Sequence, residues 1–76
     1  MRVWILKAGR ENGPTDTWEQ TLGVYFHKEI AIEAGMDESP MIADEYILDE
    51  ETNTDLYSKY VTKNKYYFVV DSWEVL

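Results

Sequence analysis

The chain has no cysteine and only one histidine among its 76 residues. Without cysteine it forms neither a disulfide nor a Cys-based zinc site, on which small secreted domains usually depend. The N-terminal apolar run, Val3–Leu6, is four residues long. A signal peptide needs about 7–15 apolar residues and a membrane span about 20. These absences predict one domain, residues 1–76, in the cytoplasm of a bacterial host cell, with no membrane contact.

Motifs that carry catalytic chemistry are also missing from the sequence. There is no Gly-rich phosphate loop, no G-x-S-x-G and no H-E-x-x-H, and no cysteine to act as a nucleophile. His27 stands where a predicted strand meets a predicted helix, a position at which a lone histidine is usually structural or exposed. We therefore predict that the protein is not an enzyme, with no catalytic residue and no cofactor.

One segment, Asp49–Asp55, has oxygen-bearing side chains at alternate positions, as a calcium-binding EF-hand loop does. The loop needs Gly at its sixth position and Glu at its twelfth, where this chain has Thr54 and Tyr60. We favour a polar hairpin turn without a metal site. Weak cation binding stays open as the alternative.

The apolar residues that are present are enough for a folded domain, since 45% of the chain is hydrophobic and includes three Trp, six Tyr and two Phe. Runs of β-branched and aromatic residues bounded by Gly, Pro, Asn and Asp predict strands. The predicted strands are Val3–Ala8, Thr17–Phe26, Ile42–Leu48, Leu56–Thr62 and Lys65–Val75, and the predicted helix is Lys28–Ala34. This order, β-β-α-β-β-β, predicts an α+β fold with a small antiparallel sheet of about five strands and one short covering helix.

The pattern also predicts local details of the second strand. Alternation places four residues on one core-facing side, and Gly23 among them suggests a bulge or a close approach of the backbone. The four predicted core residues are Trp18, Leu22, Val24 and Phe26.

Within the helix, Ile30 and Ala34 are neighbours four residues apart, and Ala31 extends their buried face. Gly35 is suited to the position just after the last helical residue. In the last hairpin, Asn64 tolerates a positive φ and predicts a tight turn at Lys63-Asn64.

Charge of one sign dominates the middle of the chain. The net charge is −8, yet residues 29–55 contain ten acidic residues and no Lys or Arg. A field of one sign repels nucleic acid and anionic membranes and attracts basic surfaces. An ordinary solvated face remains open as an explanation, although solubilising surfaces usually mix both signs. Alternate residues of a strand lie about 6.6–6.8 Å apart on one face, comparable with the spacing of DNA phosphates. The predicted partner-binding residues are Glu33, Asp37, Glu38, Asp44, Glu45, Asp49, Glu50, Glu51 and Asp55.

Two resemblances bear on function. The segment Gly23–Ala34, the opening strand Val3–Leu6 and the closing Ser72–Val75 resemble a family of small uncharacterised phage and bacterial proteins. In size and charge the whole chain resembles small acidic phage early proteins of the DNA-mimic type, which take over host machinery. The second resemblance implies a non-enzymatic, phage-encoded inhibitor. Its partner would be a basic host DNA-binding protein, such as a nucleoid-associated protein of the HU type, a polymerase or a nuclease, and it would not bind nucleic acid directly.

Aromatic residues near the C-terminus provide the alternative. They are interleaved with lysines, a pattern that can stack on single-stranded nucleic acid, but the acidic remainder favours half-buried sheet aromatics. Some of them are expected to hold a homodimer. The alternative function is a protein-interaction module whose hot spot is aromatic. The aromatics concerned are Tyr57, Tyr60, Tyr66, Tyr67, Phe68 and Trp73, and the lysines are Lys59, Lys63 and Lys65.

Overall fold

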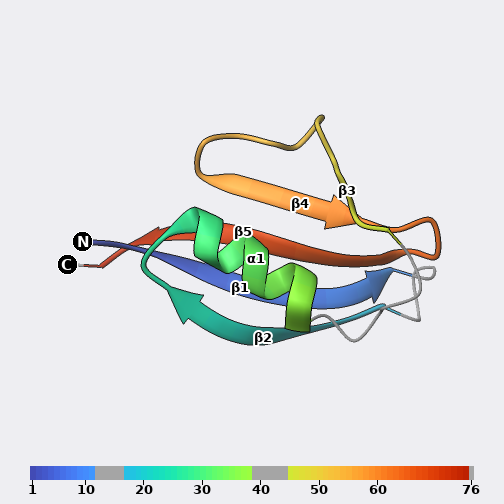
Figure 1. Ribbon diagram of the computed structural model, residues 1–76, viewed down its shortest axis with the longest axis horizontal. Coiled ribbons are helices and arrows are strands. Elements are labelled where there is room, and N and C mark those ends of the chain that lie inside the picture. The colour runs from blue at the N-terminus through green and yellow to red at the C-terminus, as the bar shows by residue number, and fades with distance from the viewer. Residues whose placement is uncertain (12–16, 39–44, 76) are drawn as a thin grey trace.

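The computed structural model describes residues 1–11, 17–38 and 45–75 and forms a five-stranded sheet with one helix (Figure 1). All strand pairs are antiparallel, and the order across the sheet is β2-β1-β5-β4-β3. The N- and C-terminal strands are therefore neighbours at the centre. The predicted α+β fold and its order along the chain are confirmed. The elements are β1 (Arg2–Glu11), β2 (Thr17–Tyr25), α1 (Lys28–Glu38), β3 (Ile47–Leu48), β4 (Tyr57–Val61) and β5 (Tyr66–Glu74).

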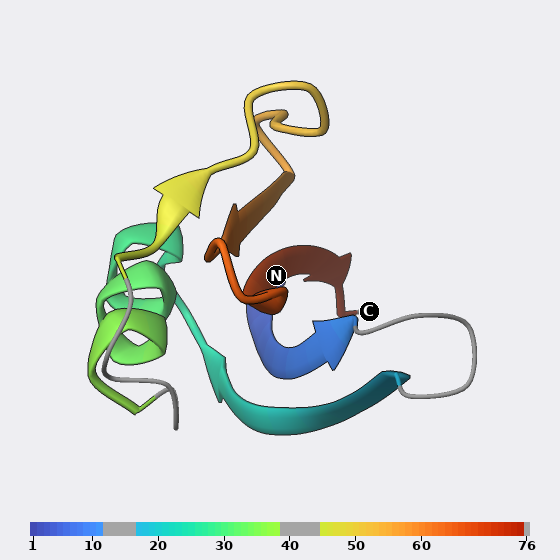
Figure 2. The same cartoon turned by 90° about the vertical axis from the view of Figure 1, so that its right-hand side faces the viewer.

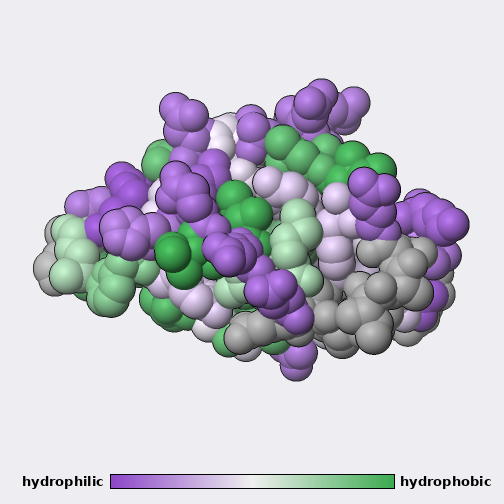
Figure 3. Space-filling model, in the orientation of Figure 1, coloured by the Kyte–Doolittle hydropathy of each residue, from purple (hydrophilic) through white to green (hydrophobic). Residues whose placement is uncertain are grey.

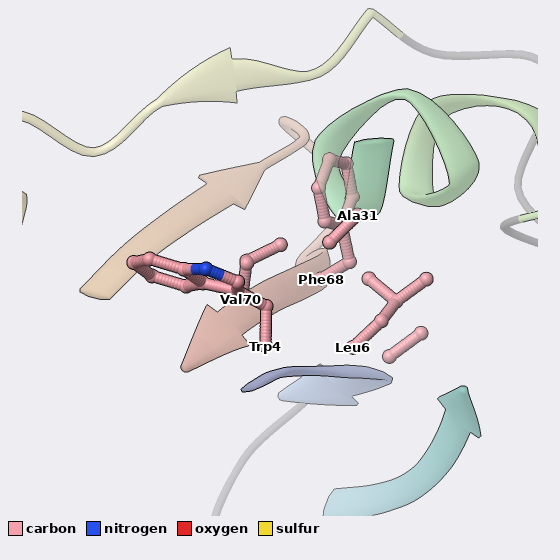
Figure 4. Packing of buried hydrophobic residues seen from close by; sticks show 6 residues of the cluster. Trp4, Leu6, Ala31, Phe68 and Val70 are labelled. Atoms are coloured by element: carbon pink, nitrogen blue, oxygen red, sulfur yellow. The ribbon is translucent and has the colours of Figure 1, made fainter. Parts of the chain in front are cut away.

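Helix α1 lies against one face of the sheet, where it packs on β1, β2 and β5 (Figure 2). The core forms between them (Figure 4), where Phe68 of β5 rises toward Ala31 of α1 beside Leu6 of β1. Phe68 stacks on Tyr60, with ring centroids 4.9 Å apart, and meets the edge of Tyr46 at 5.1 Å. Aromatic residues thus supply much of the core, as expected for a chain poor in Leu.

Strand β2 departs from its predicted alternation. Its register against β1 skips Leu22, which becomes an extra residue beside Gly23. The expectation of an irregularity at Gly23 is confirmed. A bulge changes which alternate residues face the core, so that both Leu22 and Tyr25 pack against it. The prediction of one buried row was wrong for three exposed residues, Trp18, Val24 and Phe26.

Helix α1 begins at Lys28 as predicted but continues to Glu38. Gly35 is therefore not a C-terminal cap. It is a buried helical residue, and a Cβ placed on it would lie 2.5 Å from Cε1 of Phe68. Glycine is needed here because the helix backbone rests directly on that ring.

The buried side of α1 agrees with the prediction at Ala31 and Ala34, which lie in or pack against the core, and differs at Ile30. Ala31 is fully buried, with Gly35 one turn further along, whereas Ile30 is 51% exposed. The i,i+4 pair that carries the packing is therefore Ala31 and Gly35. Ile32 and Ala34 also pack against the core, but they are only partly buried.

The remaining differences are at turns and edges. Strand β3 is only Ile47–Leu48, and the earlier part of the predicted strand, residues 42–44, lies outside the described residues. In the β4–β5 hairpin the positive φ belongs to Lys65, at 73°, and not to Asn64. Thr62 N–H donates to Tyr66 O, and Lys65 N–H donates to Thr62 O. This is a three-residue loop with its left-handed residue last.

No helix within the described ranges is long and apolar enough to cross a membrane.

Candidate functional site

The outer side of α1 carries a row of carboxylates. Glu29, Glu33 and Asp37 are all exposed, and they are spaced four residues apart. With a rise of 1.5 Å per residue, such side chains follow one another about every 6 Å along a helix. We call these three residues the helix row. In the space-filling view, hydrophilic side chains run across the face of the molecule over α1 (Figure 3).

The helix row costs the helix stability. Glu29 lies in the first turn, where the helix dipole favours an acid, but the last turn contains Asp37 and no basic residue. Like charges four residues apart destabilise a helix by about 0.2–0.5 kcal/mol per pair, and an acid at the C-terminus opposes the dipole. No described Lys or Arg forms an ion pair with any of the three.

A second acidic group lies in the turn between β3 and β4. Glu50, Glu51 and Asp55 are exposed there, and we call these three residues the turn acids. Asp49 is half-buried and serves the turn itself. Its carboxylate accepts hydrogen bonds from the Glu51 N–H at 3.3 Å and the Thr52 hydroxyl at 3.1 Å.

The same hydrogen bonds bear on cation binding by this segment. Both carboxylate oxygens of Asp49 accept donors, and Oδ1 of Asn53 accepts the Ser58 hydroxyl at 2.7 Å. A hard cation would have to compete for these oxygens. Across the described ranges there is no group of three or more His, Cys, Asp or Glu side chains placed to hold a metal ion.

Lys28 joins the two acidic groups. Its ammonium donates to the carbonyl oxygens of Thr54 at 3.0 Å and Asp55 at 3.4 Å, and lies 5.5 Å from the centre of the Trp4 ring. The start of α1 is thereby fixed beside the end of the β3–β4 turn, as Figure 1 also shows. This ammonium is hydrogen-bonded to backbone oxygens and forms no ion pair with a described carboxylate. The N-terminal end of α1, where the helix row begins, therefore lies close to Asp55 of the turn acids.

A shallow depression opens beside the helix row. It has a volume of about 340 Å³ and is lined by Tyr25 of β2 and by Ile30, Glu33, Ala34 and Asp37 of α1. Its floor is thus apolar and aromatic, while two members of the helix row stand at its edge. A long side chain with an apolar stem and a cationic head matches this combination.

Not all predicted partner-binding residues belong to this surface in the described structure. Glu45 is exposed just before β3, and Asp44 lies outside the described residues. Glu38 ends α1, but its side chain is not among those described. Sequence reasoning missed Glu29, although its spacing from Glu33 was visible. It also missed Tyr25 and Ile30, whose roles depend on the bulge in β2 and the orientation of α1.

The aromatic residues near the C-terminus belong mostly to the fold. Tyr67 and Phe68 are buried, and Tyr60 is stacked on Phe68. The Tyr67 hydroxyl reaches over Gly9 of β1 and donates to Oε2 of Glu19 on β2 at 2.7 Å. Burial and this hydrogen bond raise the pKa of Tyr67 well above its ordinary value. Trp73, 53% exposed, is the exception.

His27 stands at the N-terminal end of α1. Its carbonyl oxygen accepts the Ala31 N–H at 3.1 Å, the first hydrogen bond of the helix, and its side chain is exposed. The residue is thus placed to start the helix.

Comparison of the chain with protein-family models, with curated proteins and with solved structures finds no match.

Proposed function

We propose that this protein is a non-enzymatic acidic inhibitor that occupies the DNA-binding surface of a basic protein in place of DNA. The observation that carries the proposal is the helix row of Glu29, Glu33 and Asp37, exposed, evenly spaced and unpaired by any described cation. A row that weakens its own helix is difficult to explain by folding alone. A spacing of about 6 Å along the helix is comparable with that of DNA phosphates.

The chemistry of the partner follows from the surface. A protein that binds the DNA backbone presents Lys and Arg placed for successive phosphates. The helix row and the turn acids offer carboxylates to such residues. The depression at Tyr25 and Ile30 takes the stem of one Arg or Lys, with its head against Glu33 and Asp37. DNA itself is repelled, so we propose no direct nucleic-acid binding.

The alternative, an interaction module with an aromatic hot spot, receives less support. Its candidate residues are largely committed to the core, because Tyr67, Phe68 and Tyr60 are buried or stacked within the fold. Trp73 alone among them is exposed by more than half, and it lies away from the acidic surface.

The test measures binding to a purified nucleoid-associated protein of the HU type, as a function of salt and with duplex DNA as competitor. Exposed ion pairs are screened over about 8 Å at physiological ionic strength. Affinity should therefore fall steeply with added salt, chiefly through slower association. DNA should displace the protein, and DNA mixed with the protein alone should show no binding.

Three matched variants, each removing two charges, locate the contact. The helix variant is Glu33→Gln with Asp37→Asn, and the turn variant is Glu50→Gln with Glu51→Gln. Each should weaken binding by about tenfold or more, because losing charge contacts worth about 1.4 kcal/mol lowers the affinity tenfold. The control, Glu11→Gln with Glu74→Gln, removes two exposed acids outside the acidic stretch, and binding should change less than threefold.

Glu19 is unsuitable as a control because it accepts the Tyr67 hydroxyl. If all three variants lost the same amount of binding affinity, net charge alone would explain the loss, and a specific binding surface would be contradicted. Simultaneous occupancy of the partner by DNA and this protein would contradict mimicry altogether.

A further inference from the structure

The face of the sheet opposite α1 ends in a group of apolar side chains. Paired residues of antiparallel strands point to the same face, and Trp4 and Leu6 point toward α1. The alternate residues of β1 and their partners therefore point away from it. Val3 pairs with Trp73, and Ile5 pairs with Val24. Before β1, the Val75 N–H donates to Met1 O at 2.7 Å. We call this group the terminal patch: Met1, Val3, Ile5, Val24, Trp73 and Val75.

The terminal patch is exposed to an unusual degree. Met1 is 72% exposed, Val24 59%, Trp73 53% and Val75 44%, and no described helix packs over them. An aromatic side chain alone spans roughly 150–250 Å², so the patch as a whole exposes on the order of 500 Å². That is at the upper end for a monomer, whose largest apolar patch is about 300–600 Å². Twice this area approaches the roughly 1,200 Å² of a small specific interface.

Charge around the terminal patch is balanced. Glu74 pairs with Arg2 at 3.2 Å and with the N-terminal ammonium at 3.5 Å. Further along the same face, Lys7 and Asp71 contribute one charge of each sign. In a chain of net charge −8, two copies repel one another over most of their surface. The terminal patch is a place where that repulsion is small.

We propose that the terminal patch is the surface on which a second copy of this chain docks, with the two sheets face to face about a twofold axis. A twofold interface requires a surface that complements itself, and an apolar area bordered by charges of both signs does so. A basic partner finds no cluster of acids there. The helix rows of the two copies then point outward. This inference does not depend on the proposed function.

The inference also identifies which residues form the dimer that the sequence suggested. Of the aromatics near the C-terminus, only Trp73 belongs to the terminal patch, and Tyr67 and Phe68 are buried within the chain. The aliphatic residues around Trp73, from β1 and β2, become the larger part of the interface.

Sedimentation of the purified protein tests the proposal without any partner. The full chain should be a dimer at tens of micromolar, and added salt should tighten the dimer because screening reduces repulsion between the copies. The patch variant, Val24→Thr with Trp73→Thr, places β-branched Thr, which favours strands, at both positions. It should weaken dimerisation at least tenfold while its circular dichroism stays unchanged.

A control variant, Met36→Gln with Leu56→Thr, changes two exposed apolar residues elsewhere and should leave the dimer constant within about twofold. A monomer at every concentration would overturn the proposal, as would a dimer that the patch variant leaves intact. Equal weakening by both variants would do the same. The helix variant should still dimerise, so failure here and failure of the proposed function are separate outcomes.

Discussion

Two glycines in this fold occupy places where a neighbouring group leaves no space for a side chain. Gly35 lies under the Phe68 ring, whereas a Cβ at Gly9 would collide with the backbone carbonyl oxygen of Trp18 and would lie 2.8 Å from the Tyr67 hydroxyl oxygen. At both positions the requirement is contact with a neighbour and not an unusual backbone angle, since neither has a positive φ in the left-handed range. A sequence contains no local signal for such a contact.

Gly35→Ala tests this interpretation. In an exposed helix the change would stabilise by up to about 1 kcal/mol. Here the methyl group must displace Phe68, which is fully buried, stacked on Tyr60 and edge-on to Tyr46. We expect a net loss of about 1–3 kcal/mol, as for overpacked cores, measured by urea unfolding. Glu33→Ala, exposed on the same helix, should be neutral or slightly stabilising. A Gly35→Ala variant more stable than the parent would contradict the packing described.

Tyr67 predicts a dependence of stability on alkaline pH. Burial and the bond to Glu19 raise its pKa above the unfolded value of about 10. A raised pKa means that the folded state holds the proton more tightly. The stabilisation is therefore complete below pH 10 and is lost as the pH rises above it. Burial also raises the pKa of Tyr57, in the same direction.

Tyr67→Phe should separate the contribution of Tyr67 to this pH dependence from that of Tyr57. It leaves Glu19 without its donor and should cost about 1–2 kcal/mol at neutral pH. Between pH 10 and 11 the variant should lose less stability than the parent, because the raised pKa of Tyr67 no longer contributes, while that of Tyr57 still does. Parallel unfolding curves for the two proteins over this range would show that Tyr67 does not contribute.

At the level of elements, the number, type and order of helix and strands followed from the sequence, because runs of β-branched and aromatic residues were separated by clear turn signals. Which side of β2 and of α1 is buried could not be predicted fully from the sequence. The extra residue at Leu22 reversed the alternation of β2, and in α1 Ile30 is exposed while Gly35 packs on Phe68. Both depend on contacts between elements distant in sequence.

The candidate site, too, could be predicted from the sequence only in part. The acidic stretch was evident from composition, and the even spacing of the helix row was available in the sequence. The depression at Tyr25 and Ile30 was not, because it requires both the bulge in β2 and the turn of Ile30 away from the core. The role of Asp49 within its own turn was likewise hidden.

The helix row of α1 is expected to lower the stability of the fold and to support binding of a basic partner. The helix variant, Glu33→Gln with Asp37→Asn, removes both like-charge pairs of the helix row and the acid that opposes the dipole. Glu29 stays at the favourable N-terminal end. We expect the free energy of unfolding to rise by about 0.5–1 kcal/mol, while binding to a basic partner falls. A variant that is less stable than the parent would show that the helix row supports the fold.

At the scale of the whole molecule, salt should act on folding and on partner binding in opposite directions. The net charge is −8, and acids crowd one side of a small domain, so self-repulsion destabilises the folded state. Screening by salt relieves it. The melting temperature should therefore rise between about 10 mM, where the Debye length is near 30 Å, and 150 mM, where it is near 8 Å. The rise should be smaller in the helix variant, which has two charges fewer.

Because salt is expected to stabilise the fold but weaken the complex, the two effects can be told apart. If the complex with a basic partner weakens over a range of salt in which the melting temperature rises, unfolding cannot explain the loss, and screened contacts between the two proteins remain. The Glu11→Gln and Glu74→Gln control has the same net charge as the helix variant but breaks three ion pairs. Its melting temperature should rise with salt more than that of the helix variant does, because it loses attractive pairs and keeps the repulsion within the helix row, while its binding stays close to that of the parent. A control that lost binding in step with the helix variant would mean that net charge alone attracts the partner, without a surface arranged to fit it.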